Sequence, residues 1–114
     1  MGKLIIGTAL MVLSFNTFAA SVSTTTTIIK MYTYGEDSTY HNDMVIKVAT
    51  PLAGCESGFW LKSTDSLASK NMSAFLISAF HANSKVYFAA YNNQMWAGST
   101  PAKYCKIHSV GLVK

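Results

Sequence analysis

The sequence predicts one small domain that is mainly β-structure with a single long helix. Apolar and polar residues alternate with a period of two in five short segments, as in half-buried strands, while one segment repeats with a period of about 3.6 residues. The chain has 114 residues, which is the size of one domain. Half of its residues are hydrophobic and 12% are charged, a composition that excludes a disordered chain.

Residues 1–19 have the pattern of a secretory signal peptide. Lys3 supplies a positive charge, an apolar run follows, and the segment ends in small residues. The run is shorter than the roughly 20 apolar residues of a membrane span. Cleavage after Ala19 places Thr17 and Ala19 at the two positions that must be small. We therefore expect a periplasmic or secreted protein without a membrane span; the alternative is a buried N-terminal helix.

The exported part is expected to begin with a polar lead-in at 20–27, followed by a single domain at 28–114. The first strand is predicted at 28–34, where β-branched and aromatic residues gather. A turn at 35–38 ends it. The second strand is predicted at 44–50, because its apolar residues alternate with a second set that includes a lysine.

A short third strand is predicted at 59–62, and the period then changes to that of a helix. The residues expected to form the helix's apolar stripe are Met72, Phe75, Leu76, Ala79 and Phe80. The segment 63–66 offers capping oxygens before this stripe, and Asn83 with Ser84 suits a left-handed end.

Two more strands are predicted, at 85–91 and at 104–113, with a bend near Ser109 where the apolar phase shifts. The order strand, strand, strand, helix, strand, strand is that of a five-stranded OB-like barrel. In that fold Phe75, Leu76 and Phe80 would close one end of the barrel. The alternative is an open antiparallel sheet with one covering helix.

Cys55 and Cys105 both lie in the exported part, and a pair in an oxidising compartment is first interpreted as a disulfide. On the loop-entropy model, a bridge across this separation stabilises the fold by about 4 kcal/mol. The alternatives are a zinc pair or a nucleophile. Zinc requires further ligands at short spacings, whereas His41, His81 and His108 are scattered.

Four segments carry a resemblance to known proteins: GCESGFWL at 54–61, LISAFHANSKV at 76–86, WAGS at 96–99 and YCKI at 104–107. Together they resemble an uncharacterised family of small secreted gammaproteobacterial proteins, over residues 28–113. The resemblance implies no catalytic or binding residue. In architecture the chain is also similar to the OB-fold B subunits of AB-type bacterial toxins, which implies glycan binding and a ring-shaped homo-oligomer.

The sequence indicates a protein that is not an enzyme, and we expect no catalytic residue, cofactor or metal. The three histidines lie apart, the five acidic residues form no convincing pair, and no phosphate-binding glycine loop or nucleophile motif occurs. Nucleic acid is disfavoured because the chain has nine lysines but no arginine and a formal net charge of +4. A membrane-surface role is disfavoured because the helix carries only Lys70.

The segment that follows the fourth predicted strand offers amide groups beside an aromatic ring, which suits a sugar. The candidate ligand-binding residues are Tyr91, Asn92, Asn93, Gln94 and Trp96. In the alternative, Trp96 folds back onto the domain. Trp60 is expected in the core or in a subunit interface. We thus expect a secreted, non-enzymatic glycan-binding module; the alternative function is a periplasmic structural or inhibitor protein with a protein partner.

Overall fold

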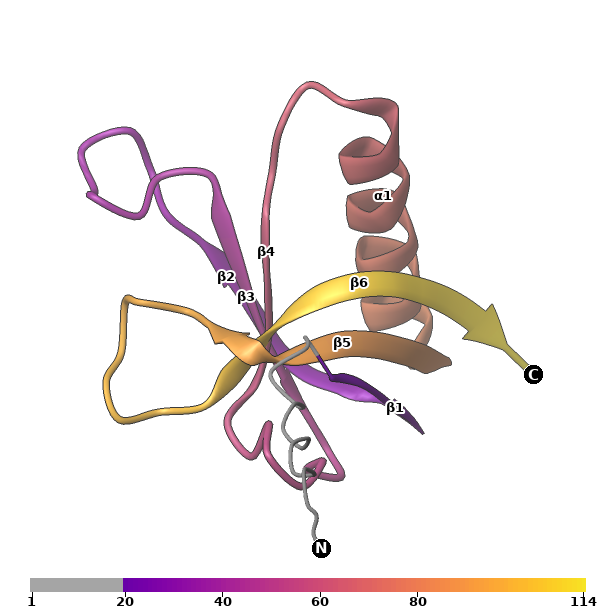
Figure 1. Ribbon diagram of the computed structural model, residues 1–114. Coiled ribbons are helices and arrows are strands. Elements are labelled where there is room, and N and C mark those ends of the chain that lie inside the picture. The colour runs from indigo at the N-terminus through magenta and orange to yellow at the C-terminus, as the bar shows by residue number, and fades with distance from the viewer. Residues whose placement is uncertain (1–19) are drawn as a thin grey trace, which may run out of the picture.

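The computed structural model describes residues 20–114, which form six strands and one helix (Figure 1). The elements are β1 (Ser21–Thr26), β2 (Ile28–Thr33), β3 (Asp43–Val48), β4 (Gly58–Lys62), α1 (Leu67–Ala82), β5 (Lys85–Met95) and β6 (Tyr104–Val113). The predicted signal peptide at 1–19 lies outside the described residues. No helix within the described residues is long and apolar enough to cross a membrane.

All six strands belong to one mixed sheet with the order β1-β5-β6-β4-β3-β2. Neighbours are antiparallel except β4 and β6, which are parallel. That parallel pairing joins a β1-β5-β6 group to a β2-β3-β4 group, and in Figure 1 the first group runs across the second. Thr27 alone separates β1 from β2, although these two strands are the opposite edges of the sheet.

The prediction of a mainly β domain with one helix is confirmed, but the prediction of a closed, five-stranded barrel is wrong in two respects. The sheet has six strands, and its hydrogen-bonded order is open. The additional strand is β1, which lies in the expected lead-in at 20–27. Its pairing with β5 uses backbone groups, so a serine- and threonine-rich segment can form it without an apolar pattern. The parallel β4–β6 pair also contradicts the alternative of an antiparallel sheet.

The ends of α1 agree with the prediction. Ser66 is the N-cap and its hydroxyl accepts a hydrogen bond from the Ser69 N–H at 3.1 Å. Asn83 ends the helix in the left-handed conformation, with φ of 53°. The predicted packing stripe was too broad, because Leu76 and Ala79 are buried whereas Phe75 and Phe80 are each 42% exposed. The two phenylalanines lie on opposite flanks of the Leu76–Ala79 line, since a helix completes a turn in 3.6 residues.

The main core lies between α1 and the inner face of the sheet. Phe59 of β4 stacks on Phe88 of β5 at a centroid distance of 4.5 Å and so joins the two strand groups. The β5–β6 register shifts where Ala89 faces Ser109 and Ala90 faces Ile107, which confirms the predicted bend near Ser109. The inner face is therefore filled by side chains, and the opposite, outer face carries the second cluster described below.

Candidate binding surface

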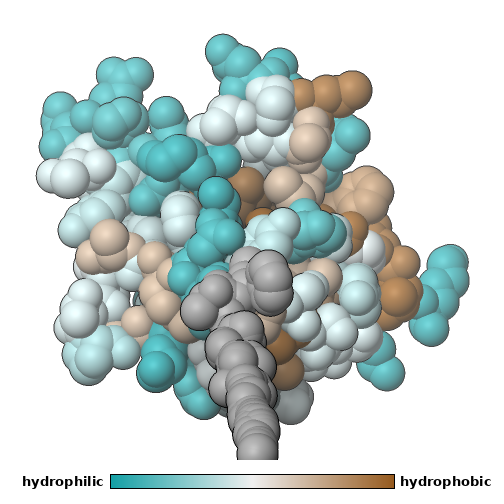
Figure 2. All heavy atoms as spheres, viewed as in Figure 1, coloured by the Kyte–Doolittle hydropathy of each residue, from teal (hydrophilic) through white to brown (hydrophobic). Residues whose placement is uncertain are grey.

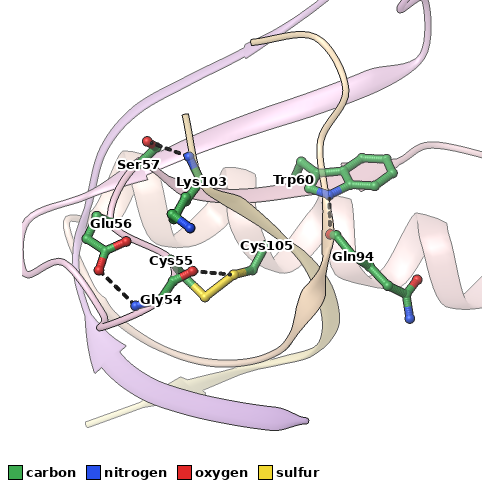
Figure 3. Close-up of a disulfide and its surroundings, with 8 residues drawn as sticks. All are labelled: Gly54, Cys55, Glu56, Ser57, Trp60, Gln94, Lys103 and Cys105. Atoms are coloured by element: carbon green, nitrogen blue, oxygen red, sulfur yellow. Dashed lines mark hydrogen bonds between the residues drawn. A yellow bond between two sulfur atoms is a disulfide. The ribbon is translucent and has the colours of Figure 1, made fainter. Parts of the chain in front are cut away.

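The predicted disulfide is confirmed and belongs to the main core, below the outer face (Figure 3). Cys55, in the turn before β4, is bonded to Cys105 of β6, and both are fully buried. Two hydrogen bonds run beside it between the same parts of the chain. Ser57 Oγ accepts from the Lys103 N–H at 2.9 Å, and Trp60 Nε1 donates to the Gln94 carbonyl at 3.1 Å. The turn before β4 and the segments on either side of the β5–β6 loop are thus held together.

The structure disperses the candidate ligand-binding residues of the β5–β6 region. Tyr91 and Asn92 are half-buried, and the Tyr91 ring packs edge-on against His108 at 5.2 Å. Asn93 and Gln94 are exposed. These four residues belong to β5, which extends to Met95 with irregular pairing after Tyr91. Trp96 is only 4% exposed, so its ring cannot stack on a sugar, and the alternative in which it folds back onto the domain is correct.

Trp96 lies at the centre of the outer face instead. Its Nε1 donates a hydrogen bond to Asp43 Oδ2 at 2.8 Å, and Asp43 is itself buried. Oδ1 of Asp43 is 3.0 Å from Lys62 Nζ. The Trp96 ring stacks on Tyr34 at 5.7 Å and meets Tyr104 edge-on at 5.6 Å. These contacts hold the β5–β6 loop across the outer side of β3.

The strand register collects further aromatic and lysine side chains around Trp96. Residues directly opposite one another in neighbouring strands project from the same face. Val45 faces both Tyr32 and Trp60, and Trp60 also faces Lys106, so these four residues form one row across four strands. We call the whole surface the aromatic–lysine face. It consists of Tyr32, Tyr34, Tyr40, Trp60, Trp96 and Tyr104 with Lys30, Lys47, Lys62 and Lys106.

Three of the lysines lie over aromatic rings of this face. The Nζ atom of Lys30 is 5.2 Å from the centroid of the Tyr32 ring. The corresponding distances are 5.9 Å from Lys47 to Tyr104 and 5.7 Å from Lys106 to Trp60. Such cation–π contacts hold each ammonium group without neutralising it. Within residues 20–114 the Lys62–Asp43 pair is the one ion pair. The face therefore presents positive charge beside aromatic surface.

Tyr32 lies among the phenol groups of this face. Burial raises its pKa above the ordinary value, and interactions with the Tyr34 and Tyr104 side chains raise it further. Tyr32 therefore keeps its proton to a higher pH than a tyrosine with the ordinary pKa does. Its O–H group can donate a hydrogen bond to another member of the face or to a ligand.

The structure does not bring the three histidines together. His41 contacts the Ser38 carbonyl oxygen, His81 is on α1, and His108 contacts Ser109. No group of three residues that could hold a metal ion occurs among residues 20–114.

The sequence reasoning missed the lysines and tyrosines of the outer face, although they share a recognisable signal. Lys30 and Tyr32 occupy one phase of the alternation in the first predicted strand, and Lys47 occupies the corresponding phase in the second. Trp60 and Lys106 do the same in two later strands. The missing information was which strands are neighbours, because only their pairing unites these residues.

Comparisons with known proteins assign neither a family nor a function to the chain. No protein-family model, no curated protein and no solved structure matches the chain.

Proposed function

We propose that the protein is a secreted, disulfide-bonded, non-enzymatic module that binds a glycan through the aromatic–lysine face. The observation that carries this proposal is the position of half-buried Tyr34, Tyr40 and Trp60 around a buried Trp96. Partly exposed rings held in fixed positions suit the C–H faces of sugars, and phenol and ammonium groups donate hydrogen bonds to sugar oxygens.

An analogy with OB-folds in the order of the strands supports this location. If β1 and β2 are treated as one strand bent at Thr27, the sheet order becomes that of an OB-fold, with the two edges joined through the chain. OB-folds bind oligosaccharides and oligonucleotides on one strand face and the two loops beside it. The aromatic–lysine face occupies that place, because it combines β2, β3 and β4 with the 34–42 and 96–103 segments.

A glycan fits this surface better than a single-stranded nucleic acid does. Binding of successive bases needs freely accessible ring faces. Trp96 and Tyr104 are each 4% exposed, and their rings pack against other rings of the cluster. The chain also lacks arginine, whose planar guanidinium group stacks on aromatic rings and recognises phosphate.

A glycan array probed with the chain from residue 20 onward tests the proposal. We expect selective binding to a group of related glycans. Trp60→Ala should abolish the signal and Trp60→Phe should retain part of it, since phenylalanine keeps an aromatic face. The control is Tyr87→Ala, because Tyr87 is an exposed tyrosine of β5 outside the aromatic–lysine face. No glycan signal, or equal signals from wild type and Trp60→Ala, would reject the proposal.

A second candidate function, binding of a protein partner, is favoured by apolar side chains on α1. Phe75, Ile77 and Phe80 are 42, 48 and 42% exposed, and Leu67 is 72% exposed. Figure 2 shows hydrophobic residues gathered on the side of the molecule that carries α1 and the end of β6. Such surface suits a protein interface, including the ring-shaped homo-oligomer expected above.

Native mass spectrometry of the chain from residue 20 tests the second candidate. A closed oligomer that Phe75→Ser dissociates would support it. A monomer that captures no periplasmic protein would exclude it.

A further inference from the structure

Two lysines face each other directly across the β2–β3 pair. Lys30 and Lys47 are Cα partners in this antiparallel register, so their side chains leave the same face of the sheet. Like charges in such a position repel each other and destabilise the pairing. A sheet that retains two lysines there has a concentrated positive charge at one point of its surface.

No acidic side chain compensates this pair. Lys30 and Lys47 make no ion pair in the described part of the chain, where Asp43 is already paired with Lys62. Glu36 and Asp37 follow the far end of β2, several residues beyond Lys30. The two ammonium groups contact the rings of Tyr32 and Tyr104, which attract cations but carry no opposing net charge.

The surroundings of the pair offer neutral hydrogen-bond donors. The two rings that the ammonium groups contact are those of Tyr32 and Tyr104, and each ring carries a phenol O–H group that can donate a hydrogen bond. Gly58 of β4 lies beside Lys47 and is paired with Tyr104 of β6, so Lys47 reaches the Tyr104 ring across a residue that has no side chain. A Cβ atom at Gly58 would lie 2.1 Å from the Ile46 carbonyl oxygen, so the close approach of β3 and β4 requires glycine at this position.

We propose that Lys30 and Lys47 form an anion site that binds a sulfate or carboxylate group carried by the glycan. The inference rests on the proposed function and specifies its ligand as an acidic glycan. Two ammonium groups and adjacent phenol O–H groups supply charge-assisted hydrogen bonds to the oxygens of such a group. Binding removes the repulsion between the lysines, so an acidic glycan gains energy that a neutral glycan of the same size does not.

Isothermal titration calorimetry with two matched probe pairs tests this site. The probes are sulfated and unsulfated dextran oligosaccharides of one length, and oligogalacturonate with its methyl ester. We expect wild type to bind the acidic member of one pair more tightly. Lys30→Gln and Lys47→Gln should each weaken that binding by about tenfold, the loss typical of one charge-assisted hydrogen bond. Both variants should lose clearly less affinity for the neutral member than for the acidic one, and should be no less stable than wild type.

Lys70→Gln and Lys85→Gln are the matched controls, because they remove the same charge from α1 and from the start of β5. Equal losses in controls and test variants would mean unspecific attraction and would overturn the site. Equal binding of acidic and neutral probes would overturn the site but leave the proposed function intact. Absence of binding to every glycan would reject both. Tighter binding of a single-stranded oligothymidylate than of any acidic probe would overturn the glycan as the source of the anion.

Discussion

At the scale of single residues, the contact between Trp96 and Asp43 decides the shape of the outer face. A buried carboxylate is costly unless it is paired and hydrogen-bonded, and Asp43 obtains both from Lys62 and from the Trp96 N–H. The same contact turns the indole into the face, where it supports the rings of Tyr34 and Tyr40. Trp96 is therefore a structural centre of the surface, and its neighbours form the accessible part.

We predict that Trp96→Ala lowers the free energy of unfolding by about 3–5 kcal/mol, the usual cost of truncating a buried large aromatic residue. The variant leaves a cavity beside Tyr34 and Tyr104 and removes a hydrogen bond to buried Asp43. Urea unfolding followed by circular dichroism measures the change. Tyr87→Ala serves as the comparison, since Tyr87 is 39% exposed and should lose much less stability. Equal losses in the two variants would contradict this account of Trp96.

We also predict that the folded state loses stability as the pH rises above 10, in part because of Tyr32. Its pKa is higher in the folded than in the unfolded chain, chiefly through burial. Above the ordinary tyrosine pKa of 10.0 the unfolded chain releases this proton while the folded chain retains it, so unfolding becomes more favourable. Short-exposure urea titrations from pH 8 to 11 test this. The decline should be shallower in Tyr32→Phe than in wild type or in Tyr87→Phe.

At the scale of elements, how well the sequence predicted the structure depended on whether an element has a local signal. The ends of α1 were predictable because Ser66 and Asn83 act through their own side chain and backbone. β1 was not, because its six residues pair with β5 through backbone groups and lack an apolar alternation. The aromatic–lysine face was predictable only in fragments, since its strands meet through long-range pairing and a helix separates β4 from β5.

The end of α1 allows a direct test of a backbone requirement. Asn83 has φ of 53°, a conformation that asparagine tolerates and that glycine adopts freely. We predict that Asn83→Ala lowers the unfolding free energy by roughly 1 kcal/mol, whereas Asn83→Gly leaves it unchanged or raises it. Thermal unfolding of both variants measures the difference. A Gly variant less stable than the Ala variant would contradict the backbone requirement at this position.

At the scale of the whole molecule, the two strand groups meet along a short parallel seam. The seam between β4 and β6 consists of these residue pairs: Gly58 with Tyr104, Phe59 with Cys105, and Trp60 with Lys106. The disulfide crosses next to it, from the turn before β4 to the middle pair. The aromatic–lysine face spans the same seam, with Trp60 on one side and Lys106 on the other. The bridge thus supports the fold and the candidate site together.

We predict that the double variant Cys55→Ala/Cys105→Ala lowers the free energy of unfolding by about 4 kcal/mol, because the bridge restricts an unfolded loop of about 50 residues. Alanine is used at both positions because each cysteine is fully buried and a polar replacement would lack a partner. Urea unfolding measures the loss. Hydrogen exchange at low temperature should be faster at the amides of the seam than at those of β2 and β3, because only the seam depends directly on the bridge. Uniformly faster exchange over the whole sheet would show that the bridge stabilises the fold globally and has no special role in joining the two strand groups.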